Sequence, residues 1–268
     1  VDPTPATLTE TLDIYRNVRA FFEIDAAHDH LHVRATSLVN TWAPEPVDSQ
    51  LGWDAVQDAF VYRRGAQWHP AAEFIYPSIH VHPGALFADY ARPSFAPGRP
   101  LIDAARELMQ RVHAEFTYRA DSTQINTPAA VALERRMGVC QAFSHVMLAC
   151  LRSLGLPARY VSGYLLTQPP PGMPRLVGSD ASHAWVSVFL PDVAARTGGH
   201  GWYDLDPTNC RDGWGSPGED FIRLAVGRDY ADISPMRGVL HGSGKHKLDV
   251  GVTVEPFEAA SLADAPPV

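Results

Sequence analysis

The chain has 268 residues, of which 46% are hydrophobic, and carries a formal net charge of -8 with a pI near 5.8. This size and composition allow a sizeable core in one large domain or two modest ones. The negative charge argues against nucleic acid as the main partner, because phosphate binding needs a basic face that displaces counterions. No apolar run approaches the ~20 residues of a membrane span, so we expect no membrane partner either.

Three widely spaced cysteines occur, at positions 140, 150 and 210. An odd and scattered set does not make a disulfide framework, which favours a reducing compartment and a cytoplasmic location. The sequence begins at Val1 rather than methionine. That start is compatible with a removed initiator Met, signal peptide or longer leader.

The first 97 residues contain two stretches with the alternation of β-strands. Apolar side chains occupy every second position in 17–24 and in 31–39, and 27–30 between them suits a hairpin turn. We therefore expect an N-terminal β domain over residues 1–97, with polar side chains on its outer face. Prolines and glycines crowd 93–100 and mark its boundary.

Two helices are expected after this boundary. In 101–118, apolar side chains recur at intervals of three and four, with charged and amide side chains opposite. A shorter helix is predicted over 129–136, with Thr127 as its N-terminal cap. Gly138 would then permit a sharp turn before Cys140.

Cys140 stands at the start of a third apolar run with helical spacing. The stripe contains Ala142, Phe143, Val146, Met147, Cys150, Leu151 and Leu154. A cysteine in the first helical turn faces unpaired backbone N–H groups and the positive end of the helix dipole, both of which favour thiolate. Cys140 is therefore the candidate nucleophile, and Cys150 on the stripe is expected in the core.

Two later strands carry a candidate base and a candidate acid. Residues 182–190 predict a strand that begins at His183, and 201–209 predict one whose end carries Asp206. Further strands are expected over 158–166 and 221–226. A helix-borne thiol facing an imidazole and a carboxylate is the arrangement used in thiol acyl transfer.

Four segments, in this order, resemble the transglutaminase-like superfamily, a branch of the papain-like thiol enzymes: GVCQAFSHVMLACLRSLGLPARYVSGYL, SHAWVSVFLP, GWYDLDPTN and FIRLAVGRDYADISPMRGVLHG. They further resemble its bacterial branch with an N-terminal β region, over roughly residues 100–242. Since members of that branch begin with a further hairpin, the resemblance implies that the β domain is truncated at its start. The resemblance implies an α+β fold with a papain/transglutaminase-like core over 98–240. Within 241–268, a last strand over 246–254 is expected to return to the β domain.

The resemblance also implies a catalytic triad of Cys140, His183 and Asp206. His145 is a rival base, but ~100° of rotation per helical residue turns it away from the thiol. Asp204 shares a strand face with Asp206, so alternation cannot choose between them; the D-P-T motif of the family selects Asp206. Cys140 could also be a small buried residue with no chemistry.

No cofactor or metal is expected. His80 and His82 would face one side of a strand, yet no third ligand accompanies them. No glycine pattern suited to cradling phosphate is present. Cys210 follows the D-P-T-N turn and is expected in a loop.

The predicted reaction is attack of the Cys140 thiolate on a carboxamide or peptide carbonyl, so the expected partner is a peptide or protein substrate. Backbone N–H groups at the helix start would stabilise the oxyanion, with Gln141 as a candidate side-chain donor. The loop over 168–178 could form one wall of the substrate cleft.

Attack of the thiolate would leave the acyl group on Cys140 as a thioester, which either water or an amine could cleave. Calcium-dependent animal transglutaminases carry tryptophan where this chain has Gln141, and no dense acidic loop resembles a calcium site. Hydrolysis as a cysteine protease or amidase is therefore favoured. Protein-glutamine transamidation is the alternative, and a catalytically silent binding or scaffold module is the third.

Overall fold

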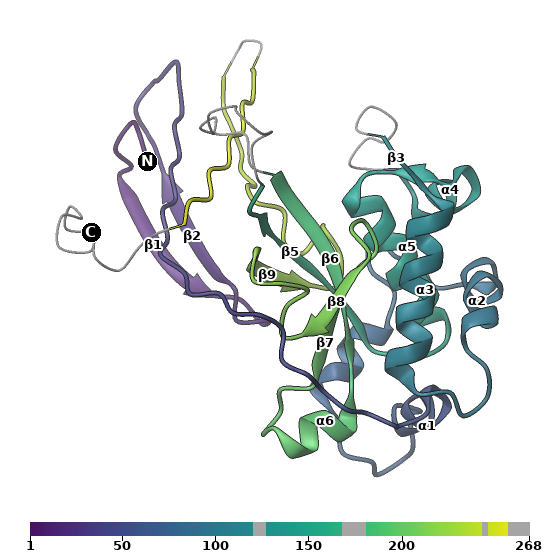
Figure 1. Cartoon of the computed structure of the whole chain (residues 1–268). Coiled ribbons are helices and arrows are strands. Elements are labelled where there is room, and N and C mark those ends of the chain that lie inside the picture. Colours follow the sequence, from purple (N-terminus) through teal and green to yellow (C-terminus); the bar gives the residue numbers. More distant parts are fainter. Residues whose placement is uncertain (120–126, 168–180, 243–245, 257–268) are drawn as a thin grey trace.

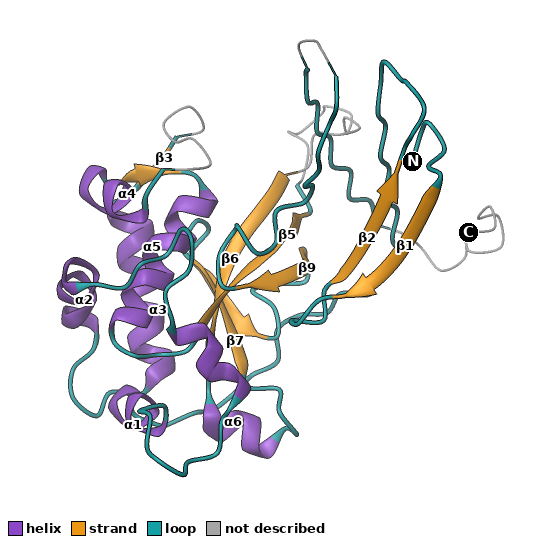
Figure 2. Cartoon of the chain, turned by 180° about the vertical axis from the view of Figure 1, so that it is seen from behind, coloured by secondary structure: helices purple, strands orange, loops and turns teal. Residues whose placement is uncertain are grey.

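The computed structural model describes residues 1–119, 127–167, 181–242 and 246–256. A layer of helices packs on a five-stranded antiparallel sheet, and a separate two-stranded hairpin stands on the side of the sheet away from the helices (Figure 1). The view from behind shows the same order of helices, sheet and hairpin (Figure 2). This architecture confirms the predicted α+β class.

The sheet has the strand order β8-β7-β6-β5-β9, and each neighbouring pair is antiparallel. Its strands are β5 (Ala158–Leu165), β6 (Ala181–Phe189), β7 (Trp202–Asp206), β8 (Arg211–Trp214) and β9 (Phe221–Gly227). These strands correspond to the four predicted ones, with β8 added. His183 lies near the start of the central strand β6, opposite Gly163 of β5.

The helix that begins at Cys140, α5 (Cys140–Ser153), is buried on every side. All its residues from Ala142 to Arg152 are buried. Strands β5 and β6 cover one side of it, and α2 (Ala85–Ala91), α3 (Leu101–Glu115) and α4 (Ala129–Arg135) cover the others. A helix enclosed in this way needs apolar side chains all round rather than along one stripe.

Residues before position 97 contribute to this same core. Helix α1 (Trp53–Ala59) and the short helix η1 (Pro70–Ile75) precede α2, and η2 (Arg92–Ser94) follows it. Val56, Val81 and Phe87 lie in one hydrophobic cluster with α3 and α5. The boundary at residue 97 stays a prediction, although this packing groups 53–95 with the helices rather than with the hairpin.

The hairpin pairs β1 (Thr7–Leu12) with β2 (Val18–Glu23), so the strand predicted over 17–24 is present but its predicted partner is wrong. Residues 31–39 form no strand, and His32 makes a single bridge to Asp2. The Asp13 carboxylate explains the difference, because it accepts hydrogen bonds from the backbone N–H groups of residues 15 and 17, both at 2.9 Å. These bonds close a tight turn between β1 and β2.

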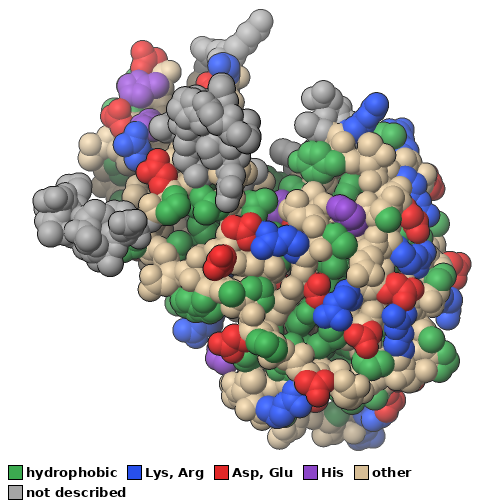
Figure 3. All heavy atoms as spheres, in the orientation of Figure 1, with side chains coloured by type: hydrophobic (Ala, Val, Ile, Leu, Met, Phe, Trp, Pro, Cys, Tyr) green, Lys and Arg blue, Asp and Glu red, His purple; other side chains and the backbone are tan. Residues whose placement is uncertain are grey.

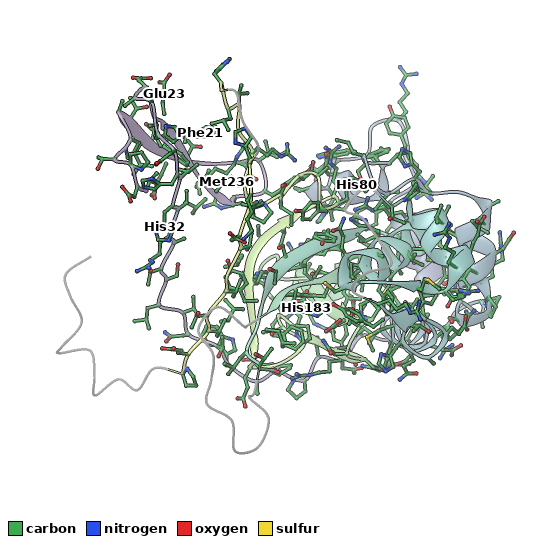
Figure 4. The ribbon with its side chains drawn as sticks, turned by 90° about the horizontal axis from the view of Figure 1, so that it is seen from above. Phe21, Glu23, His32, His80, His183 and Met236 are labelled. Atoms are coloured by element: carbon green, nitrogen blue, oxygen red, sulfur yellow. The ribbon has the colours of Figure 1, made fainter. Side chains whose placement is uncertain are left out.

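One side chain joins the hairpin to the sheet. Asn17 donates from Nδ2 to the carbonyl of Val226 at 2.8 Å and accepts from the N–H of Val226 at 2.9 Å. The Tyr15 ring lies 5.2 Å from that of Phe74. Phe21, by contrast, is 54% exposed and lies on the hairpin well away from His183 (Figure 4).

The predicted C-terminal strand over 246–254 is not formed. Residues 246–256 run as an extended segment without a strand, although Val252 is 7% exposed and so buried. Alternation of apolar residues in this stretch therefore predicted burial at one position but no hydrogen-bonded ladder. No described helix has the length and hydrophobicity needed to cross a lipid bilayer.

The turn that delivers Cys140 is made at Arg136 rather than at Gly138. Arg136 has a φ of 53°, and β4 (Met137–Gly138) pairs in parallel with β3 (Thr117–Tyr118), which keeps Gly138 in a strand. A left-handed non-glycine residue costs about 1–2 kcal/mol. The Arg136 guanidinium stacks over the Tyr90 ring at 4.3 Å, which offsets that cost. Helix α4 has no side-chain cap, so Thr127 does not have its predicted role.

We predict that Arg152→Met destabilises the fold by about 3–5 kcal/mol. Arg152, in the last turn of α5, is 3% exposed and donates to the carbonyl of Ala158 at 2.8 and 3.0 Å and to the Ser78 hydroxyl at 3.2 Å. Its loss would leave the buried Asp229 carboxylate without its nearby cation. Urea unfolding measures the effect.

Arg64→Met is the matched control, because Arg64 is exposed and its replacement should change the free energy of unfolding by no more than about 0.5 kcal/mol. An Arg152 variant as stable as the Arg64 variant would contradict this account.

Candidate active site

Cys140 is the first residue of α5 and is half-buried, whereas Cys150 is fully buried in the same helix. The carbonyl of Val139 accepts a hydrogen bond from the N–H of Phe143 at 3.1 Å, so Val139 is the N-cap of the helix and Cys140 lies in its first turn. The backbone N–H groups of the first turn have no acceptor within the helix. Together they give the N-terminal end of the helix a partial positive charge. Cys140 therefore lies where an anionic sulfur or oxygen is stabilised.

The structure brings the three predicted residues together. His183, in β6, is 6% exposed, and its Nε2 lies 2.8 Å from Oδ2 of Asp206 at the end of β7. The Cys140 side chain lies near enough to the imidazole to act on the pKa of His183. Because Nε2 is engaged by the carboxylate, Nδ1 is the nitrogen left for the thiol. Figure 4 shows His183 beside the strands of the sheet.

The environment of His183 favours its charged form. Burial acts against the imidazolium, but the hydrogen bond to Asp206 and the nearby Cys140 thiol outweigh burial and raise the pKa of His183 from 6.5 to about 10. At neutral pH the ring is therefore protonated. An imidazolium beside a thiol can hold a thiolate and later give its proton to a leaving amine.

Asp206 is fixed by its own turn. Its Oδ1 accepts from the backbone N–H of Thr208 at 2.9 Å and of Asn209 at 3.3 Å, which is an Asx-type turn. His113 Nδ1 lies 2.9 Å from the Thr208 carbonyl and holds the turn to α3. The D-P-T-N segment thus serves both to reverse the chain and to aim the carboxylate at His183.

Asn209 is a site residue that the sequence analysis did not select. Its Nδ2 donates to Oδ2 of Asp206 at 2.7 Å and lies 3.3 Å from His183 Nε2. The sequence carried a signal for this role, because the side-chain amide of a residue three positions after a turn-forming aspartate can hydrogen-bond to that carboxylate. Asn209 therefore forms a network of three side chains with His183 and Asp206.

The rival carboxylate, Asp204, has another task. It is 1% exposed, lies opposite Ser187 in the ladder and accepts a hydrogen bond from the Ser187 hydroxyl. Burial raises the pKa of Asp204, while the nearby Arg159 guanidinium opposes this rise. Asp204 therefore belongs to the interior of the sheet layer, and Asp206 is the carboxylate that meets His183.

The rival base, His145, lies in a separate buried cluster. Its Nε2 accepts from the backbone N–H of Tyr230 at 3.3 Å, and its ring stacks on His80 at 5.4 Å. Burial lowers the pKa of His145 to about 3, so the ring is neutral. Within the described ranges, no group of three or more His, Cys, Asp or Glu side chains could hold a metal ion.

Trp185 and Gly163 both pack around His183. The Trp185 ring stacks on the imidazole at 6.1 Å and is almost fully buried. Gly163 pairs with His183 in the ladder, and a Cβ there would lie 2.5 Å from the Trp185 ring and 2.1 Å from the Ile222 carbonyl oxygen. Glycine is thus required for this packing, which no sequence pattern indicated.

Two predicted features stay predictions. The loop over 168–178, expected to form a cleft wall, lies outside the described residues. Gln141 is half-buried in the first turn of α5, and its part in oxyanion binding rests on its position alone.

Comparisons with known proteins indicate the family of this chain. Residues 88–207 match the Transglutaminase-like superfamily. An uncharacterized protein of Mycobacterium tuberculosis (strain H37Rv) is 38% identical over 271 residues, which cover 98% of this chain and 82% of that protein. A protein-glutamine gamma-glutamyltransferase of Pseudomonas aeruginosa is 31% identical over 135 residues, which cover 48% of this chain and 19% of that protein.

A solved structure also resembles this chain in part. A candidate cysteine protease from Cytophaga hutchinsonii aligns with a TM-score of 0.47 and 24% identity, over 59% of this chain and 47% of that one.

The elevated pKa of His183 predicts a pH dependence of stability. Since the folded-state pKa of about 10 lies above the unfolded value of 6.5, the stability that this group contributes is complete below pH 6.5 and is lost as the pH rises to about 10. Urea unfolding of the wild type and of His183→Gln near both ends of this range measures it. NMR titration should show one imidazole still protonated near pH 8.

Asp206→Asn serves as the matched control, because it removes the charge that holds the imidazolium and should return the pKa of His183 towards 6.5. A stability difference between wild type and His183→Gln that does not change with pH would contradict this assignment.

We also predict that Asn209→Ala slows alkylation of Cys140 by iodoacetamide about five-fold, since the loss of one hydrogen bond costs ~1 kcal/mol. The amide holds the Asp206 carboxylate in place and so acts on the thiol through His183. Gln50→Ala is the control, because the exposed Gln50 amide bonds only to Asp48 among the described residues. Equal rates for the two variants would argue that Asn209 has no positioning role.

Proposed function

The chain belongs to the transglutaminase-like superfamily, and from this premise we propose that it is an enzyme of thiol-dependent acyl transfer. The single observation that supports this most is the His183–Asp206 hydrogen bond of 2.8 Å beside a thiol at the start of α5. Its substrates would be peptides or carboxamides. Cys140 would act as nucleophile, His183 as acid and base, and Asp206 as the group that orients the imidazole.

In the acylation step, Cys140 sulfur would form a bond to the carbonyl carbon while the C=O electron pair moves onto oxygen. Backbone N–H groups at the start of α5 would stabilise this oxyanion, and each such donor typically contributes ~3 kcal/mol. His183 would then give its proton to the departing nitrogen as the C–N bond breaks. The products are a thioester on Cys140 and a free amine or ammonia.

In the second step, His183 would take a proton from the incoming nucleophile as that nucleophile attacks the thioester. Water would release an acid and make the protein a protease or amidase, whereas an amine would form a new amide. We favour hydrolysis, because Gln141 stands where calcium-dependent animal transglutaminases have tryptophan. Transamidation is the alternative, and the similarity to a Pseudomonas aeruginosa protein-glutamine gamma-glutamyltransferase supports it.

A catalytically silent binding module is the remaining possibility for this fold. The enclosure of His183 and its hydrogen-bond network with Asp206 and Asn209 argue against it, because a buried imidazolium without chemical use would be a costly element in a scaffold.

Loss of Cys140 is predicted to abolish product formation. The wild type, Cys140→Ala and the control Cys210→Ala would be incubated with a peptide pool and a primary amine, and the products identified by mass spectrometry. Cys210 is the suitable control, since it is also half-buried but sits in the turn after Asn209. We expect fragments or deamidated glutamine with the wild type and Cys210→Ala, and none with Cys140→Ala.

Amine adducts instead of hydrolysis products would select transamidation. If Cys140 reacts with iodoacetamide at mildly acidic pH no faster than Cys210 does, the binding-module account would replace the enzyme.

A further inference from the structure

A groove lies directly beside the candidate catalytic centre. Its volume is about 240 Å³, and it lies between the extended segment 39–42, the turn after β8 and the start of β9. The groove is lined by Val39, Asn40, Thr41, Trp42, Trp185, Gly215, Ser216, Phe221, Ile222 and Arg223. A typical small-molecule pocket has ~300–1,000 Å³, so this one fits one or two side chains rather than a whole cofactor.

The groove is connected to His183 through its walls. Trp185 and Phe221 line it, and the same two rings contact the imidazole, with centroid distances of 6.1 and 5.8 Å. Trp185 and Phe221 also pack edge to face at 5.5 Å. A side chain bound in the groove would therefore lie one aromatic ring away from the reacting centre, close enough to be part of the same substrate.

The groove offers an apolar surface and one positive charge. Trp42 is 67% exposed, and within the described part of the chain its ring contacts no other aromatic ring. Arg223 is exposed and has no ion pair with a described carboxylate, unlike the nearby Arg211, which pairs with Asp220 at 2.6 Å. An unpaired guanidinium beside an exposed indole is suited to a carboxylate flanked by an apolar group.

Local charge rather than net charge decides the partner here. The protein carries -8 overall, and on the face shown in Figure 3 acidic and basic side chains are interspersed. Among the residues that line the groove, Arg223 is the only charged one. One cation is too few for a polyanion such as a nucleic acid, whose binding depends on releasing many counterions.

We propose that this groove is a substrate subsite for acidic peptides, in which Arg223 pairs with a Glu or Asp side chain and Trp42 covers a neighbouring apolar side chain. This rests on the proposed function, because it assigns a substrate class to the same centre. The acyl donor would then be a carbonyl a few residues from an acidic and apolar pair. Trp185 and Phe221 form the common wall of groove and catalytic centre.

Binding can be tested without turnover in the Cys140→Ala variant. Fluorescence anisotropy would compare a labelled glutamine peptide containing a Glu-Phe pair with the same peptide containing Lys-Phe. We expect the acidic peptide to bind at least five-fold more tightly, and Arg223→Gln to weaken it about five-fold. Trp42→Ala should weaken both peptides about ten-fold, since it removes the apolar contact.

Arg64→Gln is the matched control, because it removes the same charge from an exposed loop and should leave binding unchanged. Equal affinity for the two peptides, unchanged binding by Arg223→Gln, or no saturation below ~1 mM would each overturn the proposal. Such a failure is distinct from failure of the acyl-transfer proposal, which is judged on the wild type by alkylation of Cys140.

Discussion

Enclosure of α5 is the constraint on which the rest of the structure depends. A helix whose every residue from Ala142 to Arg152 is buried can shift neither along its axis nor about it without opening the core. The sheet, α2, α3 and α4 therefore fix the position of its first residue, Cys140. The chemistry of the site needs little further support on the cysteine side, because the packing of the whole domain already positions the thiol.

The opposite side of the site is positioned by hydrogen bonds instead. His183 is held by Asp206, Asp206 is held by its own turn and by Asn209, and the turn is held to α3 through His113. The neighbouring buried carboxylate of Asp204 is held through one oxygen by the Ser187 hydroxyl. A site built from one rigidly packed element and one polar network can keep its geometry while the adjoining groove accepts different side chains.

The sequence allowed prediction of those parts that depend on local pattern or on a motif. Helical spacing located α3 and α5, and β-rich composition between turn residues located β5, β6 and β9. The prediction failed where a single residue, rather than the spacing of apolar residues, sets the backbone geometry. Asp13 forms the turn that pairs β2 with β1, and Arg136 makes the turn that was expected at Gly138. The groove could not be predicted, because it arises from contacts between segments that only the fold brings together.

The contact of Asn17 with Val226 has a consequence for how the molecule avoids self-association. Strand β9 is an outer strand, and the unpaired N–H and C=O groups of such a strand can recruit a strand from another molecule. The Asn17 carboxamide supplies one donor and one acceptor, as a peptide group would, and occupies the N–H and C=O of Val226. The Asn17 side chain thereby blocks strand pairing at this position of β9, and the hairpin that carries Asn17 protects this edge of the sheet against edge-to-edge association.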